Sequence, residues 1–425
     1  MKFRMLIILM TLFLCCAKKD DVQKVQFWAF GGMPNYMQWT KDMVTKFNAA
    51  HPDIKVIQSQ KSWHMIRELL YTNYSAGTGP DVMRVHGNYA AEFGEGGYFL
   101  PINTFPDFEE VKRWYLPILF ESTRYKDNYY GLPGPSIAFT LVCNKKLFDE
   151  AGLTSPKTWS QFREAAQKLT KDTNGDGIVD QHGLVLLGGE KGGFSYRLAA
   201  FMYKAGVNFL SDDLSNAIFN SPEAVATVKL FADMYQVDKS ITPGFLAYTI
   251  SEINDLFCSD KVAMSIEGPW FATSVNDKLP GKQFYTVPVP VPDDKIDQYD
   301  TAPTLQDMVM LSISANAKHP EAAWEFVKFM RGNEADIIWL KQEMGGFPTT
   351  LNALNSPESS DYTDFAVYRH ELEHARPWPS HPKMIAIVRN IISIYGQKAI
   401  VGELSPQEAM DKAVVEAQNM IDENK

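Results

Sequence analysis

Short apolar runs of strand length alternate with helical patterns along most of this chain. Residues 25–30 (VQFWAF) form one such run, and residues 39–47 then carry apolar side chains at helical spacing. A second strand-like run at 51–60 and a helical pattern at 67–74 repeat this order. Strands that alternate with helices predict an α/β fold, in which a largely parallel sheet carries helices on both faces.

The composition limits the classes of protein that such a fold can serve. The 425 residues are enough for more than one domain, and 45% hydrophobic with 22% charged residues is typical of a globular protein. A formal charge of −10 disfavours nucleic acid as a partner, since nucleic-acid binders carry basic surfaces. The sequence also lacks the glycine motifs that bind nucleotides and the nucleophile elbow of hydrolases, so no organic cofactor is indicated.

The first sixteen residues differ from the rest. Lys2 and Arg4 flank the start of the apolar run MLIILMTLFLCC, which is too short to span a membrane and is typical of a secretory signal. The run ends at Cys15 and Cys16, and a cysteine in this place resembles the lipidation site of bacterial lipoproteins. We therefore predict that residues 1–16 direct export and leave a protein lipid-anchored to the cell membrane, facing the periplasm or the cell exterior. A plain signal peptide that ends in cysteine is the alternative.

Two cysteines remain beyond this segment, Cys143 and Cys258. Two thiols make neither a disulfide framework nor a metal site. They either pair with each other in an exported protein or serve as small apolar residues.

The segment HELEH satisfies the H-E-x-x-H pattern of zinc hydrolases. His370 and His374 would share one helical face and bind Zn²⁺, with Glu371 polarising a bound water. The context argues against this, because charged Glu373 lies between the histidines, Pro377 ends the helix within a turn and nothing marks a third ligand. A solvent-facing charged helix is the favoured interpretation, and a zinc hydrolase stays as the alternative.

Oxygen-bearing side chains alternate in the segment DTNGDGIVD. Asp172, Asn174 and Asp176 occupy positions 1, 3 and 5 of a Ca²⁺ loop, the carbonyl of Ile178 position 7 and Asp180 position 9. Position 12 is a glycine and not the bidentate glutamate of an EF-hand, so water or a remote side chain must complete the cage. We predict a structural Ca²⁺ site in this loop. A turn held by Asx hydrogen bonds alone is the alternative.

Tryptophan is the other distinctive residue type. Four tryptophans lie in or beside predicted loops: Trp28, Trp63, Trp270 and Trp378. Trp324 and Trp339 fall on helical apolar patterns instead and are candidates for the core. An indole has a flat apolar face and a polar edge, which suits the C–H face of a sugar ring. The loop tryptophans are therefore candidates for a ligand platform.

Several motifs follow one another along the chain: GPDV (79–82), CNK (143–145), GPW (268–270), HPEAAW (319–324), GGFPTT (345–350) and ARPWPSHP (375–382). In this order they resemble the maltose-type class of substrate-binding proteins of ABC importers, which are often lipid-anchored. The resemblance covers about residues 24–424. Each motif alone is weak, and the combination is specific.

The resemblance implies a two-lobed periplasmic-binding-protein fold of type II, in which crossing strands join two α/β lobes around a ligand cleft. Lobe one is expected to comprise residues 22–137 and 289–345, and lobe two residues 138–288 and 346–425. The crossings are expected near 134–140, in the VPVPVP stretch and near 345–350. Calcium-bearing members of the class carry a comparable loop, which supports the predicted Ca²⁺ site.

The resemblance also places the binding residues in turns that face the cleft. Trp270 and Trp378 are expected to stack on sugar faces. Asp307, Asn88 and Arg376 are expected to hydrogen-bond sugar hydroxyls. The remaining candidates are Phe30, Gly31, Trp63, His86, Tyr89 and Gln306. The loop before ISANAK lacks the usual glycine-rich run, so Gln306 and Asp307 are expected to give contacts peculiar to this protein.

These features predict a binding protein and not an enzyme. A monomer would capture a sugar or oligosaccharide by hinged closure and deliver it to the transmembrane subunits of an ABC permease. A receptor that senses the ligand and signals to a membrane partner is an alternative that the sequence does not separate from transport.

Overall fold

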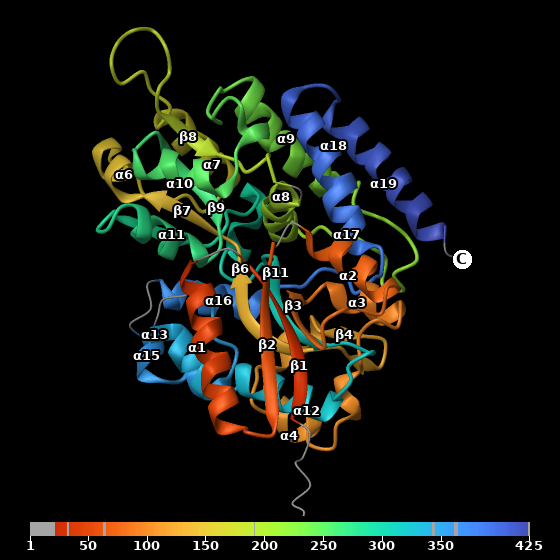
Figure 1. Cartoon of the computed structure of the whole chain (residues 1–425). Helices are drawn as coiled ribbons and strands as arrows, with labels where there is room; N and C mark the ends of the chain where they lie inside the picture. The colour runs from red at the N-terminus through yellow and green to blue at the C-terminus, as the bar shows by residue number, and fades with distance from the viewer. Residues whose placement is uncertain are drawn as a thin grey trace, which may run out of the picture.

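Two β-sheets organise the chain into two lobes, which lie one above the other in Figure 1. The computed structural model describes residues 22–31, 34–62, 65–190, 192–341, 345–360 and 364–423. The sheet of the first lobe has the order β2-β1-β3-β11-β6, and that of the second lobe β10-β7-β9-β8. The first sheet contains β1 (Gln23–Phe30), β2 (Ile54–Lys61), β3 (Val82–His86), β6 (Leu132–Ala138) and β11 (Gln306–Ile313). The second contains β7 (Thr140–Asn144), β8 (His182–Val185), β9 (Val262–Glu267) and β10 (Phe284–Val287), and a hairpin of β4 (Arg124–Tyr125) and β5 (Asn128–Tyr129) stands apart.

Both sheets are mixed, so the expectation of largely parallel pairing is wrong. In the first sheet β1 is parallel to β2 and β3, but β11 is antiparallel to β3 and β6. In the second sheet β8 and β9 are parallel, whereas β7 is antiparallel to β9 and β10. The reason is the exchange of chain between the lobes. Strands β7 and β11 each enter a lobe directly from a crossing and therefore run against their neighbours.

Strand β1 shows how the sequence builds a sheet covered on both faces. Alternate side chains of a strand point to opposite faces, and both faces are buried here. Val25, Phe27 and Ala29 pack into one core cluster of the first lobe, and Trp28 and Phe30 pack into the other. A continuous apolar run such as VQFWAF is therefore what this position requires.

Helices cover both faces of each sheet. In the first lobe they are α1 (Pro34–Ala50), α2 (Ile66–Ser75), α3 (Tyr89–Glu95), α4 (Phe108–Lys112), α5 (Pro117–Glu121), α12 (Pro320–Met330), α13 (Asn333–Lys341), α14 (Leu351–Leu354) and α15 (Pro357–Ser360). In the second lobe they are α6 (Lys145–Ala151), α7 (Trp159–Lys168), α8 (Gly193–Lys204), α9 (Pro222–Gln236), α10 (Ile250–Cys258), α11 (Trp270–Lys278), α17 (Met384–Ala386), the π-helical η5 (Ile387–Ile392), α18 (Ser393–Val401) and α19 (Pro406–Asp422). Helix α16 (Phe365–His374) lies between the lobes beside β6 (Figure 1).

Two details of the second lobe bear on sequence patterns. Helix α19 begins with a capping box, in which Glu408 N–H donates to Ser405 Oγ (3.2 Å) and Ser405 N–H donates to Glu408 Oε2 (3.0 Å). In the described part of the chain, one helical stretch, Met384–Val401, has the length and apolar composition to cross a membrane. Because 61% of it is buried inside the protein, it is a core helix of the second lobe.

Cys143 and Cys258 are both free, and Cys143 is buried in β7.

The first crossing is short, and the second lies later in the chain than expected. Strand β6 ends at Ala138 in one sheet and β7 begins at Thr140 in the other, so Phe139 alone makes the first crossing. The second crossing is later than residue 289, because Val291 pairs with Thr158 of the second lobe. Lys295 donates to the Ala205 carbonyl (2.6 Å), which keeps this segment on the second lobe until shortly before β11.

The third crossing is also later than expected. Phe347 pairs with Ser136 of β6, and the helices α14 and α15 pack against α13 of the first lobe. Arg376 pairs with Leu305, and Trp378 then lies in the core of the second lobe. Residues 346–360 therefore belong with the first lobe, because their apolar side chains complete its core.

Candidate ligand-binding site

A cavity of about 460 Å³ lies between the two lobes, and we call it the central cavity. The ends of β1 and β3 and the start of β11 supply its first-lobe wall, and α8, α11 and η5 supply the wall of the second lobe. This is the edge where parallel strands of α/β sheets present their binding turns. Six of the predicted ligand residues line it: Gly31, His86, Asn88, Tyr89, Trp270 and Asp307.

On the first-lobe wall, His86 and Asp307 meet from neighbouring antiparallel strands. His86 Nδ1 lies 2.8 Å from Asp307 Oδ2, and Asp307 Oδ1 accepts a hydrogen bond from the Met308 N–H (2.8 Å). Asp307 is 4% exposed, so these partners fix its carboxylate in place. Gly31 closes β1 with φ of +152°, and a Cβ there would lie 2.8 Å from the Tyr36 ring. The glycine is required because a side chain would displace this ring from the cavity wall.

On the second-lobe wall, Trp270 begins α11 directly after Gly268 and Pro269. Its indole is half-buried and meets the Phe139 ring edge-on at 5.6 Å. Arg197 of α8 and Glu267 of β9 form a buried pair behind it, with Nη2 donating to Oε2 at 2.5 Å. Burial raises the pKa of Glu267, and the Arg197 guanidinium opposes that rise. The wall thus offers an aromatic face, and Arg197 of the buried ion pair lines the same cavity.

Two polar contacts join the lobes across the cavity. Asn88 Nδ2 donates to the Tyr196 hydroxyl at 2.9 Å, and Arg389 donates to the Tyr89 hydroxyl. Burial raises the pKa of Tyr89 to about 12, so its hydroxyl is neutral. Hydrogen bonds between lobes hold the cavity in a closed arrangement in which a ligand would touch both sides.

The other predicted ligand residues that the structure describes, Phe30, Gln306, Arg376 and Trp378, do not line the central cavity. Trp63 lies outside the described residues. Phe30 is fully buried in the core and contributes only its carbonyl, which accepts from Arg84 Nη1 (2.7 Å). Arg376 is exposed, and its backbone pairs with Leu305.

Trp378 and Gln306 border a recess of about 20 Å³, which has room for a water molecule and not for a sugar. Trp378 is 5% exposed and packs edge-on against Phe209 at 5.0 Å, so the stacking role predicted for it is wrong. Gln306 is buried and bonds Ser122 and Ser136. It ties β11 to β6 and does not face the ligand space.

Several cavity residues escaped the sequence analysis: Tyr36, Arg84, Glu190, Tyr196, Arg197 and Arg389. Arg84 could be predicted from the sequence, because it precedes His86 by two positions and must lie on the same face of β3. Glu190 and Tyr196 follow the strand β8, so the rule that ligands bind beyond strand ends also covers them. Nothing local in the sequence marks Arg389, which lies on a helix far along the chain.

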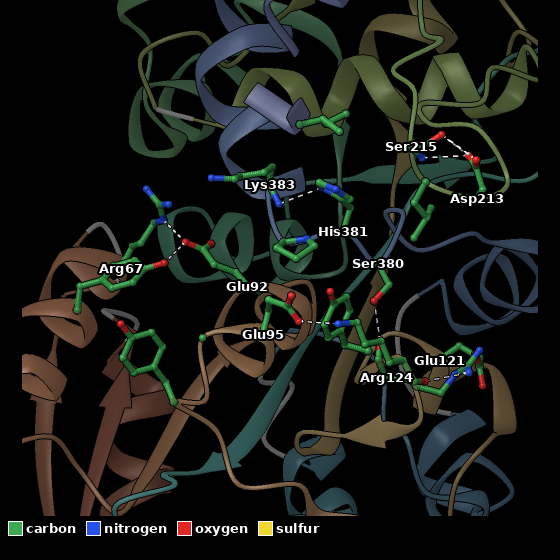
Figure 2. A pocket seen from close by; sticks show the side chains of 18 residues that line it. Arg67, Glu92, Glu95, Glu121, Arg124, Asp213, Ser215, Ser380, His381 and Lys383 are labelled. Carbon is green, nitrogen blue, oxygen red and sulfur yellow. Dashed lines mark hydrogen bonds and ion pairs between the residues drawn. The ribbon is translucent and has the colours of Figure 1, made fainter. Parts of the chain in front are cut away.

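A second and larger hollow, which we call the lateral groove, lies between the lobes to one side of α3 (Figure 2). Its volume is about 950 Å³. Its charged side chains largely pair with each other. Arg67 Nε donates to Glu92 Oε1 (2.6 Å), Lys126 Nζ to Glu95 Oε2 (2.8 Å) and Arg124 Nε to Glu121 Oε2 (2.9 Å). From the second lobe, Ser380 Oγ donates to the Arg124 carbonyl oxygen (2.6 Å), and His381 and Lys383 lie above these pairs in Figure 2.

The HELEH segment lies on α16, and the structure corrects its expected environment. Glu371 is buried and lies 3.0 Å from Lys204 Nζ, so the helix does not simply face solvent. His374 Nδ1 lies 3.0 Å from the His370 carbonyl oxygen. A glutamate held in a buried ion pair is poorly placed to polarise a water. Within the described residues, no group of three or more His, Cys, Asp or Glu side chains is arranged to hold a metal ion.

The loop that contains Asp172–Asp180 projects from the far end of the second lobe (Figure 1). Asp172 accepts hydrogen bonds from the backbone N–H groups of Asn174, Gly175 and Gly177, which lower its pKa. Asp180 accepts from Thr173. These are the bonds that the Asx-turn alternative requires. As they are arranged here, Asp172, Asp176 and Asp180 do not form a group that could hold a metal ion. Their residue types suit Ca²⁺, so the calcium site stays a prediction.

Two α/β lobes of type II topology, with a ligand-sized cavity at the strand ends between them, define the class of two-lobed solute-binding proteins, as predicted. Residues 31–337 match the family of bacterial extracellular solute-binding proteins, and the chain belongs to that family. A maltotriose-binding protein from Pyrococcus abyssi is 25% identical over 371 residues, covering 86% of this chain and 75% of that protein. A galactooligosaccharide-binding protein from Bacillus subtilis is 25% identical, covering 90% and 86% of the two chains.

The fold is also that of solved structures in this class. An ABC transporter solute-binding protein from Thermotoga lettingae, bound with α-D-tagatose, superposes with a TM-score of 0.81 at 24% identity. The alignment covers 94% of this chain and 99% of that chain. The two-lobed architecture predicted from the motifs is therefore confirmed.

Proposed function

We propose that this protein is the extracytoplasmic receptor of an ABC importer and that it captures a sugar or oligosaccharide in the central cavity. The observation that carries the proposal is the placement of the Trp270 indole opposite the His86–Asp307 pair across this cavity. The aromatic face suits the C–H face of a sugar ring, and the fixed carboxylate suits its hydroxyl groups. Relatives named for maltotriose and galactooligosaccharide support the same ligand class.

Hinged closure follows from the position of the cavity. A ligand that touches both walls binds the closed state better than the open state and shifts the equilibrium by that difference in affinity. The bonds Asn88–Tyr196 and Arg389–Tyr89 then add to the closed state. The transmembrane subunits of the permease would recognise the closed form. The protein needs no catalytic step for this task, and it is proposed to act as a monomer.

Screening of purified protein against a panel of mono- and oligosaccharides by thermal shift tests the proposal. We expect at least one saccharide to raise the melting temperature and to bind in a stoichiometric complex by calorimetry, with the sugar recovered unchanged. Failure of every saccharide to stabilise the protein would contradict the ligand class. Turnover of the sugar would favour the hydrolase alternative, and His370→Ala would then abolish it.

The family is extracellular, which supports export of this chain. We propose in addition that Cys15 or Cys16 carries the lipid anchor, since a relative from Streptomyces antibioticus is described as a lipoprotein. Labelling with a radioactive fatty acid in a bacterial host tests this. Only one of the variants Cys15→Ala and Cys16→Ala should lose the label, and label retained in the double variant would contradict the anchor. A permease gene beside this one would favour transport over sensing.

A further inference from the structure

Among the described residues, the charged side chains that line the central cavity do not all form ion pairs with one another. Three arginines and two carboxylates line it: Arg84, Arg197, Arg389, Glu190 and Asp307. What matters for a ligand is which of these charges already has an opposite partner. A charge in a partly buried cavity that meets only neutral groups favours a ligand of opposite sign.

Both carboxylates of the cavity are engaged by donors of the protein. Asp307 lies 2.8 Å from His86 Nδ1 and also accepts the Met308 N–H. Glu190 Oε1 accepts the Ile250 N–H at 3.0 Å. Ile250 is the first residue of α10, and the N-terminus of a helix favours a negative charge. Neither acid therefore requires a cationic ligand.

Of the arginines, Arg197 is neutralised by its pair with Glu267. Arg389 differs. Its guanidinium donates to the neutral hydroxyl of Tyr89, and no carboxylate among the described residues lies within ion-pair distance of it. Arg84 lies on the opposite wall, where its Nη1 donates to the Phe30 carbonyl oxygen and its guanidinium lies 4.2 Å from the centre of the Tyr36 ring.

The backbone is shaped to hold Arg389 at this place. Gly192 precedes α8 with φ of +86°, and a Cβ there would lie 3.0 Å from Arg389 Cγ. The carbon chain of Arg389 thus lies against a glycine that no other residue replaces without strain. Its charged end reaches the cavity from the second lobe, beside Tyr89 of the first.

We infer that the saccharide bound in the central cavity carries a carboxylate, as a uronic acid does, and that Arg389 pairs with that carboxylate. This inference rests on the proposed sugar-binding function. A planar carboxylate matches the two parallel N–H donors of a guanidinium. Glu190 and Asp307 line the same cavity and repel any anion, and this repulsion is stronger for a phosphate dianion than for a monoanion. A carboxylate therefore fits better than a phosphate.

Calorimetry with matched sugars tests the inference at neutral pH and low salt. The pairs are galactose with galacturonate, glucose with glucuronate, and the corresponding disaccharides, with glucose 6-phosphate as a further ligand. We expect the acidic member to bind about tenfold or more tightly than its neutral partner, and more tightly than the phosphate. Arg389→Gln should reduce this ratio to about one, and Arg389→Lys should keep part of it because the charge remains.

Lys383→Gln is the control, since Lys383 is a nearby cation that lines the lateral groove and not the central cavity. It should leave the ratio unchanged. Equal or tighter binding of the neutral sugars by the natural protein would overturn the inference and leave the proposed function intact. Preference for the phosphate would overturn the carboxylate assignment. Failure of all these sugars, together with failure of the wider panel, would overturn the proposed function as well. The comparison in the natural protein decides the matter even if an Arg389 variant does not fold.

Discussion

The central cavity and the lateral groove both lie between the lobes, and they differ in what their side chains do. The groove has about twice the volume, about 950 Å³ against about 460 Å³. Its charges largely satisfy each other, as Arg67 does with Glu92 and Arg124 with Glu121. The central cavity instead combines a half-buried indole, a fixed carboxylate and an arginine, Arg389, that forms no ion pair with any described carboxylate. The volume of a hollow therefore does not identify the ligand site. The side chains that remain available to a ligand identify it better.

Replacement of the indole should have the largest effect on ligand binding. Trp270→Ala removes the aromatic face of the central cavity, and we expect sugar affinity to fall about 30-fold, or about 2 kcal/mol, by calorimetry. Trp324→Phe is the matched control, because Trp324 is buried in the first lobe, where its Nε1 donates to Asp107. It should lower the melting temperature and leave affinity unchanged. A reversed pattern would mean that the site has been misplaced.

A carboxylate in each hollow gives the next comparison. Asp307→Asn removes a charge-assisted acceptor from the central cavity, and sugar affinity should fall about tenfold. Glu121→Gln removes a carboxylate from the lateral groove, where Arg124 is its partner, and affinity should change less than about twofold. Titration of both variants with the same saccharide measures the difference. Greater loss in Glu121→Gln would assign the ligand to the groove.

Removal of two tyrosine hydroxyls tests how much a hydrogen bond between the lobes contributes to sugar affinity, and the expected effects are smaller. Tyr196→Phe removes the acceptor of the Asn88 bond between the lobes, and affinity should fall two- to fivefold, about 0.5–1 kcal/mol. Tyr71→Phe removes a hydroxyl that donates to Glu92 within the first lobe at 2.7 Å. It should leave affinity unchanged. Equal effects of the two variants would show that the contact between the lobes does not contribute to closure.

The smallest effect on binding is expected from the loop Asp172–Asp180, which lies far from both hollows. Chelation with EDTA should lower the melting temperature by a few degrees and leave sugar affinity unchanged, because a bound Ca²⁺ would only staple the loop. Asp172→Ala should abolish this response to EDTA. A melting temperature that does not respond to chelation in the natural protein would favour a turn held by Asx hydrogen bonds alone.

The sequence predicts the lobes well because their signals are local. An apolar run such as VQFWAF must be buried on both faces, and the capping box at Ser405 marks a helix start by its own chemistry. The direction of strand pairing is harder to predict from the sequence, because β7 and β11 run antiparallel to their neighbours as a result of the crossings between the lobes. The proline-rich VPVPVP stretch predicts the second crossing too early, because such a stretch favours a connector, whereas Val291 pairs with Thr158 of the second lobe.

The site was predictable where it follows strand ends and hidden where it depends on long-range packing. Gly31, His86 and Asn88 stand directly after strands, and they line the cavity. Trp378 is flanked by prolines like a surface loop, yet it is buried against Phe209. Arg389 reaches the cavity only because η5 packs beside α8, a contact that no spacing in the sequence encodes.

A crystal structure with the saccharide that stabilises the protein most would test the central claim most directly. We expect sugar density in the central cavity, with a ring face against Trp270 and hydroxyl groups on Asp307. Density in the lateral groove, with the central cavity free of ligand, would contradict it.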